Sequence, residues 1–194
     1  MRLRWAALLC GMILCLGCPR TTPTSLTESP EAFLHKVEVR MQAGLDMLYF
    51  SAVVEQYHDL CTVLYPVLTE TLEEGYDAFR QRNGLLYNAA VRYVMLPVAF
   101  APFIERAERE RIERLANTWI PAQAKSTITA YLRGLPAAQQ YSQCTDFKSD
   151  VLAGEYDAAK HVPQAAKVIQ DAEAEVARWR REQRNHNGYR RNRF

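Results

Sequence analysis

Apolar side chains recur at intervals of three and four residues along most of this chain, a spacing that places them on one face of an α-helix. The alternating apolar and polar runs between turn residues that are typical of strands do not occur in the sequence. The pattern therefore predicts an all-α protein. Helical stripes of this kind cover residues 33–64, 67–93, 104–119, 137–153 and 162–179.

Proline and glycine residues mark the expected ends of these helices. Ser29 stands before a proline, as an N-cap does before the first helical residue, so the first helix is predicted to begin there and to end at Pro66. The second helix is predicted not to pass cleanly through Pro97 and Pro102, and the third to kink at Pro121. Gly154 is predicted to stop the fourth helix.

The chain is long enough for one compact domain with a buried core, because it has 194 residues of which 48% are hydrophobic. Short connections between amphipathic helices favour antiparallel neighbours. We therefore predict an up-and-down helical bundle of about five helices over residues 30–184, with four main helices and one packed across them.

The N-terminus has the pattern of a secretory signal. Arg2 and Arg4 precede an uncharged apolar run, residues 5–17, which is shorter than the roughly 20 residues that a membrane-spanning helix requires. We predict that residues 1–17 are a signal peptide and that the protein is exported. Residues 18–29 contain almost no apolar side chains and are predicted to form a flexible tether.

The end of the apolar run, Leu14-Cys15-Leu16-Gly17-Cys18, resembles the lipobox of bacterial lipoproteins. The resemblance implies that Cys18 is lipidated, becomes the mature N-terminus and anchors the protein to the membrane. Cys15 departs from the leucine usual at its position, and ordinary signal peptidase would cut the same bond and leave Cys18 unmodified. Pro19 after the cysteine implies the outer membrane, with the domain facing the periplasm. The alternative is a soluble periplasmic or secreted protein.

Cysteine usage predicts one disulfide. Of the five cysteines, Cys10 and Cys15 leave with the signal and Cys18 carries the anchor, so that Cys61 and Cys144 remain. Both lie on apolar helix stripes, and an oxidising compartment favours their pairing into one cross-helix disulfide. A loop of this length would stabilise the fold by on the order of 4 kcal/mol in the chain-entropy model.

Few side chains have the spacing of a catalytic or metal site. Glu55 and His58 are three residues apart, as in di-iron helical bundles, but the chain has one such motif where those sites need two. We interpret the pair as a surface feature of the first helix. Haem, phosphate-loop and hydrolase motifs do not occur in the sequence, so we expect no metal, no cofactor and, on balance, no enzyme.

Asn83 lies on the same stripe as Phe79 and Leu86 and is predicted to point inward. A buried amide costs about 1–3 kcal/mol unless it is hydrogen-bonded. We interpret Asn83 as a tie to a neighbouring helix. The alternative is that Asn83 and the adjacent Arg82 line a ligand pocket.

Residues 93–103 form an apolar connector that contains two prolines. We predict that this connector is buried as a lid on the bundle, because an exposed apolar run of this size is a liability in a soluble domain. The alternative is a docking patch for a membrane or a partner.

The C-terminus is strongly basic, with seven arginines and one glutamate from residue 178 onward. The last helix is predicted to end within residues 185–188, and residues 185–194 to be a disordered basic tail. Export makes nucleic acid an unsuitable partner, so the tail is predicted to bind anionic lipid, lipopolysaccharide or an acidic envelope protein. The alternative is a plain solubilising tail without a partner. The arginines are Arg178, Arg180, Arg181, Arg184, Arg190, Arg191 and Arg193.

These features favour a non-catalytic, envelope-associated helical binding module whose partner the sequence does not identify. The alternative hypothesis is a small-ligand or metal-binding bundle, or an enzyme, that uses Arg82 with Asn83 or Glu55 with His58.

Overall fold

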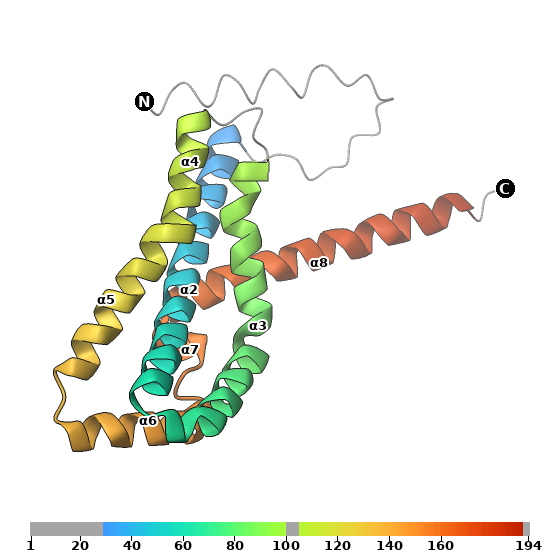
Figure 1. The fold of residues 1–194 in the computed structure, drawn as a ribbon. Helices are drawn as coiled ribbons and strands as arrows, with labels where there is room; N and C mark the ends of the chain where they lie inside the picture. The colour runs from blue at the N-terminus through green and yellow to red at the C-terminus, as the bar shows by residue number, and fades with distance from the viewer. Residues whose placement is uncertain (1–28, 100–104, 192–194) are drawn as a thin grey trace.

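The computed structural model describes residues 29–99 and 105–191 (Figure 1). The regular structure in these two ranges is helical throughout, which confirms the all-α prediction. The predicted signal peptide, Cys18 and residues 19–28 of the predicted tether lie outside the described residues, as do residues 100–103 of the apolar connector, Ile104 and Arg193.

The first helix, α2 (Pro30–Leu64), begins and ends where the sequence predicts. The Ser29 hydroxyl accepts a hydrogen bond from the Ala32 N–H at 3.2 Å, as an N-cap does. A short 3₁₀ turn, Pro66–Leu68, follows the helix, because proline cannot continue its hydrogen-bond ladder. Met47, Val54 and Cys61 are at most 1% exposed and form the buried stripe of α2.

The second helix, α3 (Thr69–Ala99), runs back along α2 (Figure 1). The two helices come close at Gly44, where an added Cβ would lie 2.8 Å from Val94 Cγ2 and 2.9 Å from the Ala90 carbonyl oxygen. The helix was predicted not to pass cleanly through Pro97, but α3 includes this proline and continues to Ala99. The fixed φ of proline is itself helical, so the chain loses one hydrogen bond there without leaving the helix.

The third segment consists of α4 (Arg106–Arg114), a π-helical stretch (Leu115–Trp119) and α5 (Ile120–Arg133). The π-helical stretch ends two residues before Pro121, where we predicted a kink, and the Ile120 N–H donates to the Leu115 carbonyl five residues earlier. Trp119, predicted to lie on the buried stripe, is 56% exposed, so that assignment was wrong. A π turn holds more residues than an α turn and therefore rotates the side chains away from the predicted face.

The fourth helix, α6 (Ala137–Leu152), crosses the end of the bundle (Figure 1). Cys144, Phe147 and Val151 are buried as predicted, whereas Tyr141 is 45% exposed. Gly154 follows the helix with φ +78°, a conformation that glycine adopts at little cost, and so confirms the predicted stop.

The predicted disulfide is confirmed. Cys61 at the end of α2 and Cys144 in α6 are bonded, with their Cα atoms 5.5 Å apart and both side chains fully buried. The bond joins two helices whose cysteines are 83 positions apart in the sequence. It therefore fixes the crossing helix to the end of the bundle.

The chain then passes through a short helix, α7 (Ala158–His161), into the long α8 (Pro163–Arg191). The first part of α8 packs against α2 and α3 and the rest extends away from the bundle (Figure 1). The prediction of a helix end within residues 185–188 and of a disordered tail from residue 185 was wrong, because the helical backbone continues to Arg191. A single glycine costs a helix only about 1 kcal/mol, which is too little to force an end.

Candidate functional site

The part of α8 beyond the bundle carries the predicted basic surface. Every residue from 177 to 184 is exposed, and Trp179, predicted to continue the buried stripe, is 59% exposed. The helix stripe that includes Ile169 and Val176 continues at helical spacing through Arg180 and Arg184. The face that packs on the bundle thus becomes a basic face once the bundle ends. We call residues 177–191 the projecting half of α8.

Acidic side chains fix α8 to the bundle just before it projects. Glu173 accepts hydrogen bonds from Arg92 Nη2 and from the Tyr93 hydroxyl, each at 2.9 Å. Burial and this hydrogen bond raise the pKa of Tyr93 to about 12. Glu175 pairs with Arg40 and with Lys36, whose Nζ lies 3.5 Å from Glu175 Oε1. Burial would raise the pKa of Glu175, but these two cations outweigh it and lower that pKa.

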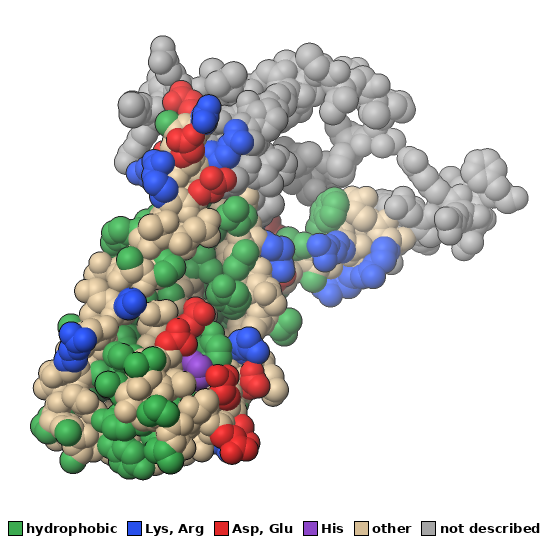
Figure 2. Space-filling model, in the orientation of Figure 1, with side chains coloured by type: hydrophobic (Ala, Val, Ile, Leu, Met, Phe, Trp, Pro, Cys, Tyr) green, Lys and Arg blue, Asp and Glu red, His purple; other side chains and the backbone are tan. Residues whose placement is uncertain are grey.

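The arginines within residues 178–184 have no comparable partners among the described side chains. Within residues 29–99 and 105–191, none of the guanidinium groups of residues 178–184 forms an ion pair or a hydrogen bond. Figure 2 shows basic side chains along this helix where it leaves the bundle. The helical backbone carries on through Arg190 and Arg191. The structure therefore gathers the described C-terminal arginines on one exposed helix, namely Arg178, Arg180, Arg181 and Arg184.

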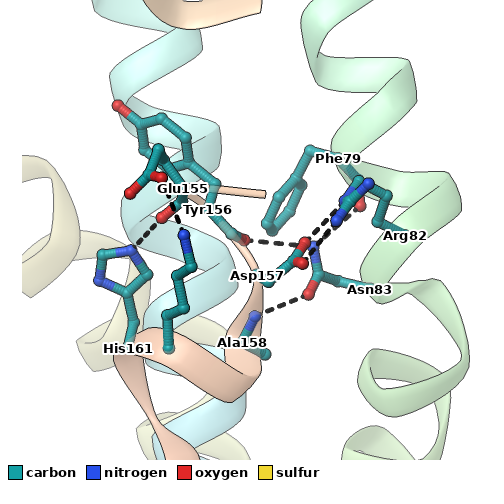
Figure 3. A network of polar contacts seen from close by, with 9 residues as sticks. Phe79, Arg82, Asn83, Glu155, Tyr156, Asp157, Ala158 and His161 are labelled. Atoms are coloured by element: carbon teal, nitrogen blue, oxygen red, sulfur yellow. Dashed lines mark hydrogen bonds and ion pairs between the residues drawn. The ribbon is translucent and has the colours of Figure 1, made fainter. Parts of the chain in front are cut away.

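Asn83 is 4% exposed and forms the predicted tie to a neighbouring segment (Figure 3). Its Nδ2 donates to the carbonyl oxygens of Phe79, at 3.2 Å, and Tyr156, at 3.3 Å. Its Oδ1 accepts from the N–H of Ala158, at 2.9 Å, which is the first residue of α7. The amide thereby satisfies backbone groups at the entry to α7 that burial would otherwise leave unpaired.

Arg82 makes a second link to the same segment. Its Nε and Nη2 donate to the two carboxylate oxygens of Asp157 at 2.7 and 2.5 Å (Figure 3). This hydrogen-bonded pairing lowers the pKa of Asp157. A ligand that binds the Arg82 guanidinium at this position would have to displace Asp157, and the Asn83 amide is already hydrogen-bonded. The ligand-pocket alternative for Arg82 and Asn83 stays a prediction.

Glu55 is exposed as predicted, but His58 is only 6% exposed, so the interpretation of both as surface residues was wrong. The spacing of His58 from Val54 and from Cys61 places it on the buried stripe, a signal that the sequence already contained. The imidazole stacks on Tyr76 of α3 with the ring centroids 4.8 Å apart.

The two ring nitrogens of His58 face acidic side chains. Nδ1 lies 3.1 Å from Asp59 Oδ1 and forms a hydrogen bond with it. Nε2 lies 3.5 Å from Glu73 Oε1 but does not form a hydrogen bond. In the described part of the chain, no three histidine, cysteine, aspartate or glutamate side chains are arranged to hold a metal ion. The arrangement thus connects α2 to α3 through one imidazole.

Comparisons of the chain with protein-family models, curated proteins and solved structures find no match. Within the described residues, no helix combines the length and apolar character needed to cross a membrane.

Proposed function

We propose that this protein is a non-catalytic binding module of the bacterial cell envelope that holds an anionic lipid surface through the projecting half of α8. The observation that carries the proposal is the exposure of Arg178, Arg180, Arg181 and Arg184 on a helix that has left the bundle. These arginines lack acidic partners among the described residues, so their charge is available to phosphate groups of lipid or lipopolysaccharide.

The helical form of this region strengthens the proposal. A basic residue near an anionic membrane contributes about 1 kcal/mol, so the four arginines could contribute about 4 kcal/mol in all. A disordered tail would lose backbone entropy of about 1–2 kcal/mol per residue that binding orders. A preformed helix avoids most of that loss.

We further propose that residues 1–17 are cleaved as a signal peptide and that Cys18 is lipidated at the outer membrane. The resemblance of residues 14–18 to a lipobox supports this assignment. A lipid anchor would hold α8 at a high effective concentration near the surface, so that a weak electrostatic attraction is enough to orient the domain. We expect Cys18→Ser to move the protein from the membrane fraction to the soluble fraction of the cell.

Vesicle flotation tests the basic surface. The chain from residue 18 onward, carrying Cys18→Ser, should bind vesicles rich in phosphatidylglycerol and not vesicles of phosphatidylcholine. Replacing the four arginines of residues 178–184 with glutamine should weaken binding at least tenfold, since a loss of about 1.4 kcal/mol suffices for that factor. Added salt should weaken the parent's binding, because exposed charges are screened beyond about 8 Å at physiological ionic strength.

A matched control removes the same charge elsewhere. Arg106, Arg111, Arg114 and Arg133 are also exposed, and their replacement with glutamine should leave binding close to that of the parent. Equal binding of the parent to both kinds of vesicle, or equal losses in the two variants, would contradict the proposal.

A second candidate function rests on His58. Its buried Nε2 has no hydrogen-bond partner in the described structure, so a small ligand or a metal ion could occupy that nitrogen. A thermal-shift screen with small molecules and divalent metals tests this candidate. We expect a stabilising ligand to lose its effect in His58→Phe and to keep it in the matched variant His35→Phe, which changes an exposed histidine of the same helix.

A further inference from the structure

Several stretches of this chain contain no charged residue, although 24% of the whole chain is charged. Two of them are residues 60–69 and residues 134–145. The first comprises the last turn of α2, the following 3₁₀ turn and the first residue of α3, and the second runs from the end of α5 into α6. The stretches are far apart in the sequence.

The fold brings these stretches together at one end of the bundle. The Cys61–Cys144 disulfide joins them directly. The rings of Tyr65 and Tyr141 meet edge to face with centroids 5.2 Å apart, and the Tyr65 hydroxyl donates to Gln140 Oε1 at 3.5 Å. We call the exposed surface of residues 60–69 and 134–145 the neutral end. Figure 2 shows apolar side chains gathered at the lower end of the molecule, where α6 crosses it.

Large apolar side chains on the neutral end are strongly exposed. Val63 is 75% exposed and Val67 is 84% exposed, and Leu64 and Tyr141 are each more than two-fifths exposed. A contiguous exposed apolar surface of this kind marks an interaction site in a soluble domain. The disulfide makes this surface rigid, so binding should cost little conformational entropy.

We propose that the neutral end is the contact surface of a two-fold homodimer. In a two-fold interface the same patch of both subunits meets, and residues near the axis face their own copies. A charged residue near the axis would meet a like charge, so a patch without charge is suited to self-pairing. A different partner would be recognised best by complementary charges, and neither stretch provides one. Interface cores are also depleted of charged residues and enriched in tyrosine.

A dimer formed through the neutral end would not block the basic surface on α8. It lies at the C-terminal end of α2, and a helix of 35 residues is about 52 Å long. The projecting half of α8 extends from the side of the bundle and leaves the neutral end uncovered (Figure 1). A dimer formed through the neutral end would therefore keep both basic helices free. This inference does not depend on what α8 binds.

Sedimentation equilibrium tests the proposal on the chain from residue 18 onward with Cys18→Ser. We expect a dimer that dissociates at or below micromolar concentration. Val63→Asp with Val67→Asp should weaken dimerisation at least tenfold, because the substitutions place like charges on the shared surface and both side chains are exposed in the monomer. Circular dichroism and a free-thiol assay should show that this variant keeps its helices and its disulfide.

The matched control is Leu85→Asp, since Leu85 is 86% exposed on α3 outside the neutral end. It should dimerise as the parent does. A parent that stays monomeric at about 100 µM, where specific interfaces of ordinary size are occupied, would overturn the proposal. Equal dimerisation of the parent and the valine variant would overturn it as well. A monomeric parent that binds phosphatidylcholine vesicles through Val63 and Val67 would show that lipid, and not a second copy, covers the neutral end.

Discussion

The two halves of α8 have the same helical backbone and opposite surroundings. In residues 163–176, Ala165, Ile169 and Ala172 are at most 5% exposed against α2 and α3. In residues 177–184, every side chain is exposed. The helix does not break where its contacts end. Packing therefore holds the first half in place, whereas only local interactions keep the second half helical.

Those local interactions suit the second half. Arginine, glutamate and glutamine have high helix propensity, and they make up most of residues 178–184. Arginines near the C-terminus of a helix also interact favourably with the negative end of the helix dipole, typically by about 0.3–1 kcal/mol. The comparison of the two halves indicates that local helix propensity is enough to keep α8 helical, whereas burial requires packing against α2 and α3.

The largest difference between the halves should come from truncating a buried side chain. Ile169 is fully buried, so Ile169→Ala should lower the free energy of unfolding by about 2–5 kcal/mol through lost burial and an added cavity. Trp179→Ala, in the exposed half, should change it by less than about 0.5 kcal/mol. Urea unfolding measures both. Similar losses in the two variants would mean that the halves do not differ in packing.

The next largest effect on the free energy of unfolding should come from the contacts that hold residues 156–158, just before α8. Asn83→Ala removes the acceptor of the Ala158 N–H and the donor to the Tyr156 carbonyl, which should cost about 1–3 kcal/mol. Arg82→Ala breaks a more exposed link and should lower the free energy of unfolding by less than Asn83→Ala does. Urea unfolding gives both values, and hydrogen exchange at Ala158 should speed up in Asn83→Ala. If Arg82→Ala lowers the free energy of unfolding more than Asn83→Ala does, this prediction is wrong.

A smaller, pH-dependent effect should mark the point where the first half ends. Because the pKa of Glu175 is lowered in the folded protein, its contribution is complete above the ordinary glutamate pKa of 4.5 and is lost as the pH falls through the lower folded value. Glu175→Gln should cost about 0.5–1 kcal/mol at neutral pH, since the pair is half exposed, and nothing in acid. Unfolding measured from pH 7 to pH 3 tests this prediction. A difference that persists in acid would contradict it.

The smallest effect should come from removing the exposed half altogether. Deleting residues 178–194 removes no buried side chain among the described residues, so the free energy of unfolding should change by less than about 0.5 kcal/mol. The far-ultraviolet circular dichroism should still decrease, because helical residues are lost. A loss of more than about 1 kcal/mol on deletion would mean that this half contacts the bundle after all.

Much of the candidate surface could be predicted from the sequence, because it depends on composition and helical spacing. The inward position of Asn83 followed from helical spacing, and the basic character of the C-terminus followed from composition. The pairing of Arg82 with Asp157 did not, because the residues are 75 positions apart and no periodic pattern connects them. The neutral end was missed for the same reason, since neither uncharged stretch reveals that the other lies beside it.

The sequence by itself determined where helices begin, where several end and which residues share a face. Ser29, Gly154 and the apolar stripes act through the backbone within a few residues, so they have the same effect in any fold. Only the tertiary structure decided which of these faces are covered. His58 is buried because α3 lies against it, and Trp179 is exposed because no described element reaches it. Spacing fixes the direction in which a side chain points, whereas burial also requires a neighbour on that side.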